Sequence, residues 1–130
     1  MKVMALDYGS ARTGVAVSDP TGVLARPLCV VERASSEAGL AELARLVREE
    51  EVERIVVGLP LTLRGARGEQ VEATERFVAA LREVVGVPVV LYDERFTTAL
   101  AAQTPSSAPE DARAAAVLLG GYLERMSSPA

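Results

Sequence analysis

The sequence contains no histidine and only one cysteine among its 130 residues. Without histidine, a Ser-His-Asp triad and a zinc site built on imidazole ligands are both excluded. Cys29 alone can form neither an internal disulfide nor a cysteine-rich zinc site, so we expect a small, buried hydrophobic side chain there. Any active site in this chain must therefore work without imidazole ligands or paired thiolates.

Long hydrophobic runs are also missing. No uncharged apolar stretch approaches the length of about 20 residues that spans a bilayer. The first apolar run ends at Asp7 after a few residues, which does not fit the pattern of a signal peptide. Together with the single cysteine, these features favour a protein of the reducing cytoplasm that does not bind membranes.

Lysine is almost absent as well, because Lys2 is the only lysine among 14 basic residues and the others are arginines. Arginine makes bidentate contacts with phosphate, although the same bias can follow from genome composition or a hot habitat. The net charge of −4 argues against a protein that coats nucleic acid through general positive charge. It still allows a local basic face.

What the chain does contain is the composition of an ordinary globular domain, with 49% hydrophobic and 25% charged residues. The length suffices for one domain with a substantial core, which we place at residues 1–126, with 127–130 as a frayed tail. Three apolar runs separated by turn residues open the chain and predict a β-meander, at 2–6, 14–17 and 27–31.

Helix and strand patterns alternate after the meander. Apolar residues at helical spacing predict one helix after Ser36 as its N-cap, a second along the stripe from Val71 to the terminating Gly86, and a last one from about Glu110. Two strands and a short helix are expected at 54–60, 87–93 and 97–103. The order β-β-β-α-β-α-β-α predicts an α/β fold with a mixed five-stranded sheet and helices on both faces.

Acidic residues directly follow two of the predicted buried strands. Asp7 ends the first strand, and Asp93 and Glu94 follow the strand "VPVVLY". A carboxylate is costly to desolvate at the end of an apolar run, so its presence calls for a reason. Ligand crevices of open α/β sheets form at the carboxyl ends of strands, so Asp7 and Glu94 meet if these strands are neighbours.

A third acid, Asp111, lies four residues before Ala115 and seven before Leu118 on the last predicted helix. These spacings place it on the apolar face of the helix, which points toward the sheet. Three converging carboxylates form a site for a hard divalent cation, Mg²⁺ or Mn²⁺. Two such ions about 3.5–4 Å apart can hold the attacking and leaving oxygens of a phosphodiester displacement.

Each acid also has a purely structural interpretation. Asp7 could cap the turn that follows it, and Glu94 could pair with Arg95 on the surface. Asp111 could belong to an ordinary helix N-terminus beside Glu110, where negative charge is favourable. The residues alone leave both interpretations open.

Four blocks in order, covering essentially the whole chain, resemble the YqgF family, also called RuvX, of pre-16S rRNA nucleases and Holliday junction resolvase-like proteins. They are "LDYGSARTGVAVSD" (6–19), "IVVGLPLTLRGARGEQ" (55–70), "LYDERFTT" (91–98) and "DARAAAVLLGGYLE" (111–124). The resemblance implies an RNase H-like fold and a metal-dependent nuclease that matures the 5′ end of 16S rRNA in ribosome biogenesis. Resolution of four-way DNA junctions is the alternative that the same resemblance implies.

The family's three acids fall on Asp7, Glu94 and Asp111, which the resemblance assigns as catalytic ligands of the divalent ions. Substrate contacts are expected from arginines and threonines in loops: Arg12, Arg64, Arg67, Arg95, Thr97 and Thr98. Surface salt bridges, solvated loops and a helix cap are the simpler alternatives for these side chains. The expected partners are structured RNA or branched DNA, ribosomal precursor particles and, for junction resolution, a second copy of the chain.

Two features depart from the family pattern. A basic segment usually precedes the last acid, whereas "AAQTPSSAPE" (101–110) contains no basic residue. Thr62, Leu63 and Arg64 stand where the second block usually carries Asn or Asp, which shifts the expected contacts to Arg64 and Arg67. Two rival functions stay open. One is a non-catalytic nucleic-acid-binding factor. The other is an ATP-binding phosphotransferase of the actin type, which would need a second domain.

Overall fold

The computed structural model describes residues 1–59, 68–93 and 109–127. Within these ranges, five strands form one mixed sheet in the order β3-β2-β1-β4-β5. β2 is antiparallel to both β1 and β3, whereas β4 is parallel to both β1 and β5. The predicted meander and mixed sheet are confirmed. The strands are β1 (Val3–Asp7), β2 (Arg12–Ser18), β3 (Ala25–Glu32), β4 (Arg54–Leu59) and β5 (Val89–Asp93).

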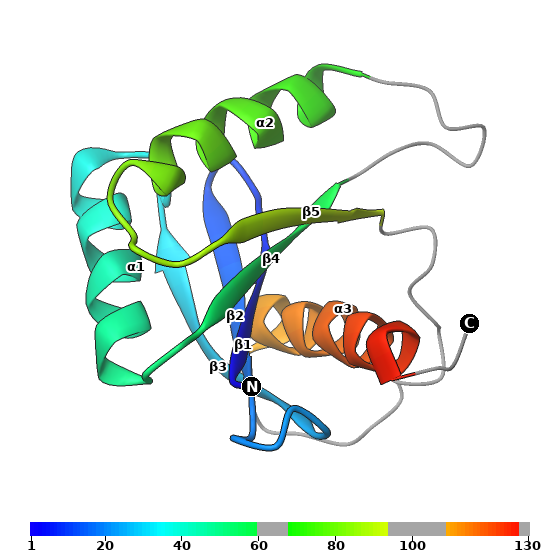
Figure 1. Cartoon of the computed structure of the whole chain (residues 1–130). Coiled ribbons are helices and arrows are strands. Elements are labelled where there is room, and N and C mark those ends of the chain that lie inside the picture. Colours follow the sequence, from blue (N-terminus) through cyan, green and yellow to red (C-terminus); the bar gives the residue numbers. More distant parts are fainter. Residues whose placement is uncertain (60–67, 94–108, 128–130) are drawn as a thin grey trace.

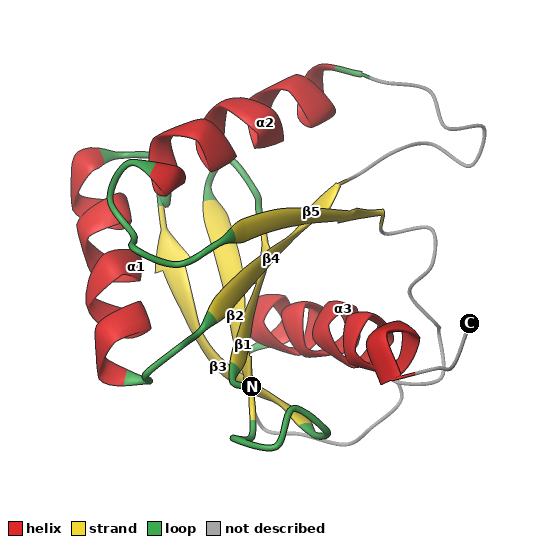
Figure 2. Cartoon of the chain, in the orientation of Figure 1, coloured by secondary structure: helices red, strands yellow, loops and turns green. Residues whose placement is uncertain are grey.

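Helices cover both faces of the sheet, as predicted. α1 (Glu37–Glu49) and α2 (Glu69–Arg82) lie on one face, and α3 (Glu110–Ser127) lies on the other (Figure 1 and Figure 2). The central strand β1 contributes Met4 and Leu6 to the core under α1 and α2, and Val3 and Ala5 to the core under α3. Successive side chains of a strand point to opposite faces, so a strand covered on both sides is apolar throughout.

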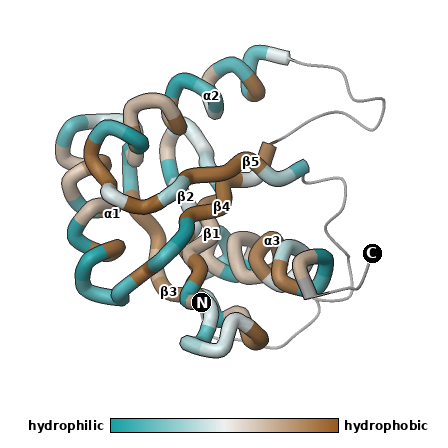
Figure 3. Tube along the Cα trace, in the orientation of Figure 1, coloured by the Kyte–Doolittle hydropathy of each residue, from teal (hydrophilic) through white to brown (hydrophobic). Residues whose placement is uncertain are grey.

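The hydropathy of the chain follows this layering. Figure 3 shows hydrophobic residues concentrated along β4 and β5 and a mixture of hydrophobic and hydrophilic residues along α1 and α2. In the described ranges, no helix combines the length and the apolar character needed to cross a membrane.

The helix boundaries follow the capping signals for α1 but not fully for α2. The Ser36 hydroxyl accepts a hydrogen bond from the Gly39 N–H at 3.0 Å, which confirms the predicted N-cap. α2 ends at Arg82, earlier than the predicted Gly86. The N–H groups of Val84 and Val85 both donate to the Leu81 carbonyl, so a tightened turn replaces the last helical turn.

Further sequence-based boundaries need correction, and one is β5, which begins at Val89, two residues later than the predicted run. β2 begins at Arg12 and β3 at Ala25, two residues earlier than the predicted runs in each case, because backbone pairing continues beyond the apolar residues. Helix α3 includes Ser127, which the sequence assigned to the tail, since helix ends are defined by backbone bonds and not by hydropathy. The short helix expected at 97–103 lies outside the described residues.

Cys29 differs from its expected environment. It lies on β3, an edge strand, and is half-buried, not fully buried. Burial raises the pKa of its thiol above the ordinary value. The position of β3 at the edge of the sheet also explains why it tolerates Pro27. Proline has no N–H to donate, and an edge strand needs hydrogen bonds on one side only.

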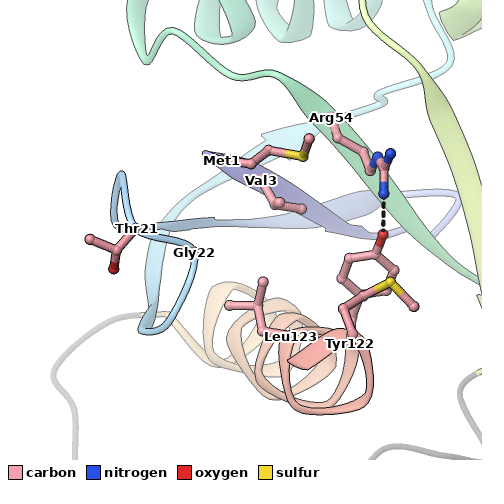
Figure 4. A pocket seen from close by; sticks show the side chains of 8 residues that line it. Met1, Val3, Thr21, Gly22, Arg54, Tyr122 and Leu123 are labelled. Carbon is pink, nitrogen blue, oxygen red and sulfur yellow. Dashed lines mark hydrogen bonds between the residues drawn. The ribbon is translucent and has the colours of Figure 1, made fainter. Parts of the chain in front are cut away.

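The carboxyl-terminal half of α3 packs against the end of the sheet that lies opposite Asp7. The Arg54 guanidinium donates to the Tyr122 hydroxyl at 3.0 Å beside a shallow pocket of about 220 Å³ (Figure 4). The rings of Tyr92 and Tyr122 meet edge to face with centroids 5.5 Å apart. These contacts fix the position of the helix along the sheet.

Candidate active site

Asp7 is the last residue of β1, directly after the fully buried Leu6, and is itself partly exposed. Because β1, β4 and β5 are parallel, their carboxyl ends meet one edge of the sheet, where Asp93 ends β5. The prediction that Asp7 and Glu94 meet assumed that β1 and β5 are direct neighbours. Strand β4 instead lies between these two strands. They nevertheless end at the same edge.

Gly14 connects the first strand to the last helix. It pairs with Asp7 in the antiparallel ladder between β1 and β2. A Cβ atom on Gly14 would lie 1.8 Å from the Asp111 carbonyl oxygen and 3.0 Å from the Ala112 nitrogen. The first turn of α3 therefore rests directly on the backbone of β2. Asp7 lies beside Gly14 in the sheet, and the backbone of Asp111 lies over it.

An ion pair directs the Asp111 side chain toward the same edge. Its Oδ2 atom lies 3.1 Å from Nε of Arg12, the first residue of β2. The Arg12 side chain is 65% exposed and that of Asp111 is 37% exposed. Because β2 starts at the edge where β1 ends, this pair brings the Asp111 carboxylate to the edge that carries Asp7.

The turn between Asp7 and β2 is held by a buried residue that the sequence did not single out. The Thr13 side chain is fully buried, and its hydroxyl accepts from the Gly9 N–H at 3.4 Å. A Cβ on Gly9 would lie 2.5 Å from the Arg12 carbonyl, so this tight turn requires glycine. Gly14, by contrast, allows the close contact with helix α3. The one sequence signal for Thr13 is the alternation of side-chain directions along β2, which indicates that Thr13 points into the core.

A groove of about 300 Å³ lies beside this turn. Tyr8 forms one part of its wall and stacks on Phe77 of α2, with ring centroids 4.4 Å apart and planes 15° from parallel. Ser10 and Gln70 add polar groups to the lining. These residues could not be predicted from the sequence, because their proximity depends on how α2 packs over the sheet.

The turn after β2 contains a structural acid, Asp19. Its carboxylate accepts from the N–H groups of Val23 and Leu24, at 2.8 Å each, and from the Thr21 hydroxyl. These bonds hold the pKa of the Asp19 carboxyl well below its ordinary value, and the bond from Thr21 has the largest effect. This acid lies at the far end of β2 and does not belong to the candidate site.

The remaining predicted site residues lie outside the described residues. They are Glu94, Arg95, Thr97, Thr98, Arg64 and Arg67. Among the described side chains, no three of the kinds that bind metals gather into a group that could hold an ion. Asp7 and Asp111 supply two partly exposed carboxylates with hard oxygen donors, which suit Mg²⁺ or Mn²⁺ as part of a larger ligand set.

The family can be decided by comparison with known proteins. A family model described as "RuvX: Holliday junction resolvase" matches residues 1–125. The chain belongs to the RuvX family.

Two relatives match this RuvX chain over nearly its whole length. A protein of Chloroflexus aggregans named "Putative pre-16S rRNA nuclease" is 41% identical over 136 residues, covering 98% of this chain and 96% of that protein. A protein of Moorella thermoacetica with the same name is 41% identical over 135 residues, covering 97% of this chain and 96% of that protein.

Solved resolvase structures share the fold of this RuvX chain. T. thermophilus RuvC in complex with a Holliday junction substrate gives a TM-score of 0.66 at 19% identity, covering 98% of this chain and 96% of that chain. The Fowlpox virus resolvase in complex with Holliday junction DNA gives 0.58 at 12% identity, covering 98% of this chain and all of that one. The RNase H-like fold is confirmed, and family and fold together support a phosphodiester-hydrolysing enzyme.

Proposed function

We propose that this chain is a metal-dependent nuclease that processes the 5′ end of precursor 16S rRNA. The observation that carries the proposal is the close packing at Gly14, which brings Asp7 and Asp111 to one edge of the sheet. These two acids are far apart in the sequence, and relatives that match nearly the whole chain are named for this substrate.

Asp7 and Asp111 would hold the metal together with Glu94, which directly follows the last residue of β5. When bound, a pair of divalent ions lowers the pKa of water and stabilises charge on the leaving 3′ oxygen. The protein's own part is to fix two carboxylates on rigid elements, a central strand and a helix packed on β2. Rigid ligands keep the donor oxygens in place without an ordering cost at binding.

Substrate contacts would come from side chains around the same edge. Arg12 is largely exposed there and can reach a phosphate. Strands β4 and β5 end at this edge with Leu59 and Asp93, and residues 60–67 and 94–108 follow them in the sequence. We propose that they provide the other contacts: Arg64, Arg67, Arg95, Thr97 and Thr98.

Cleavage of four-way DNA junctions is the second candidate. It is favoured by the family description and by the resolvase fold, although the likeness to the solved resolvases concerns architecture alone. A junction has two cleavage points, so this function would require a homodimer, whereas processing of an RNA end would not.

A cleavage assay tests the proposal. Purified protein is offered a precursor 16S rRNA leader, single-stranded RNA and a four-way DNA junction, each with Mg²⁺, Mn²⁺ or EDTA. We expect metal-dependent cutting of the leader that falls at least a hundredfold in Asp7→Asn. Glu72→Gln is the matched control, because it removes one charge from an exposed position on α2.

The pattern of cutting separates the alternatives. Preferred cutting of the junction would favour resolution over RNA processing. No cutting with any metal, together with nucleic-acid binding that is unchanged in Asp7→Asn, would contradict a nuclease and leave a binding factor on this fold.

A further inference from the structure

The ion pair between Arg12 and Asp111 occupies a carboxylate that the proposed metal site also uses. Arg12 Nε lies 3.1 Å from Oδ2 of Asp111. A guanidinium and a divalent cation on the same carboxylate would be only a few ångströms apart, where like charges repel strongly outside bulk water. The two cations are therefore expected to exclude one another at Asp111.

The structure also indicates which partner would move. The backbone of Asp111 is fixed, because its carbonyl packs against Gly14 with no room for a Cβ. Arg12 has a long side chain that is 65% exposed, and exposed ion pairs of this kind contribute little to stability. Arg12 can thus leave Asp111 at low cost, while Asp111 stays at the sheet edge.

We propose that Arg12 is an internal counter-ion of Asp111 that a divalent cation displaces, and that the released guanidinium then binds a phosphate of the nucleic acid. The inference rests on the proposed function in one respect, since it takes Asp111 as a metal ligand. It adds an order of events: the cation binds first and makes an arginine available at the edge where the substrate must lie.

The proposal has a consequence that needs no catalysis. If Asp111 occupies Arg12 in the absence of metal, Asp111→Asn releases Arg12 and strengthens metal-free binding of nucleic acid. Removal of any acid also weakens general repulsion, so a control of equal charge is required. Glu32→Gln serves as this control, because Glu32 is exposed and its backbone lies opposite that of Arg12 in the β2–β3 ladder.

We would measure binding of a labelled RNA leader in EDTA by fluorescence anisotropy. Asp111→Asn is expected to lower Kd about three- to tenfold more than Glu32→Gln does. In the double variant Arg12→Gln and Asp111→Asn, this extra gain should disappear. An equal effect of Asp111→Asn and Glu32→Gln, or a gain that survives without Arg12, would overturn the proposal.

A second measurement follows the displacement directly. The ¹⁵N signal of Arg12 Nε–H, assigned by its loss in Arg12→Gln, is recorded during a Mg²⁺ titration alongside calorimetry. We expect it to shift with the calorimetric Kd, toward its position in metal-free Asp111→Asn. Saturable Mg²⁺ binding without such a shift would overturn this inference alone. Absence of saturable binding would overturn both it and the proposed metal-dependent nuclease.

Discussion

At the scale of single residues, Gly14 is the position on which the candidate site depends most. It pairs with Asp7, and the absence of a Cβ allows the Asp111 backbone to approach β2. A methyl group at this position would push α3 away from the sheet and displace one carboxylate relative to the other.

Gly14→Ala is therefore expected to lower both stability and Mg²⁺ affinity. Overpacking of this kind costs about 1–3 kcal/mol. Gly39→Ala is the matched control, because its Cβ would lie 2.2 Å from the Arg33 carbonyl, in a contact between α1 and its preceding turn. Both variants should unfold at lower denaturant concentration, and only Gly14→Ala should weaken Mg²⁺ binding in calorimetry of the folded protein. Equal Mg²⁺ affinities in the two variants would contradict this role of Gly14.

The same residues show what could and could not be predicted from the sequence. Asp7 and Asp111 stand out because each carries charge in an apolar pattern, at a strand end and on a helix stripe. The pairing of Arg12 with Asp111 could not be predicted, since the two residues are far apart in the chain and local periodicity carries no information on their distance. The contact of Gly14 with helix α3 could not be predicted for the same reason, since the residues next to Gly14 in the sequence carry no information on its neighbour in space.

At the scale of elements, α3 is the structure that determines where Asp111 lies. Ala115, Leu118 and Leu119 are buried against the sheet, and Tyr122 anchors the distal half. Helical spacing in the sequence predicted this apolar face. The insertion of β4 between β1 and β5 was not predicted, because strand order depends on crossover connections that leave no periodic signal.

Truncation of one buried side chain in α3 tests how firmly it is docked. Leu119 is fully buried, so Leu119→Ala should reduce the free energy of unfolding by about 2–5 kcal/mol. Met126 on the same helix is 61% exposed, and Met126→Ala should change it by less than about 0.5 kcal/mol. Urea unfolding followed by circular dichroism measures both. Similar values for the two variants would show that α3 contributes little to the core.

At the scale of the whole molecule, the net charge determines how the chain can bind nucleic acid. The chain carries a net charge of −4, so we expect affinity for nucleic acid to come from a few arginines near the edge that carries Asp7 and Asp111. This arrangement ties binding to the site more closely than a broad basic face would.

The salt dependence of binding tests this view. Log Kd against log salt concentration should have a shallow slope, and Arg12→Gln should reduce its magnitude by about one in the presence of Mg²⁺. Arg45→Gln is the control, because Arg45 pairs with Glu42 and Glu49 on α1 and should leave the slope unchanged. A slope that responds equally to both substitutions would indicate binding through general charge.

The contact between Gly14 and Asp111 also sets when the site can exist during synthesis. One partner belongs to the second strand and the other to the last helix, so 97 residues separate them. At about 5–20 residues per second, a ribosome needs roughly 5–20 s to make that stretch. A nascent chain that stops before Asp111 holds no second carboxylate at the edge. The carboxylate pair can therefore form only after translation has passed Asp111.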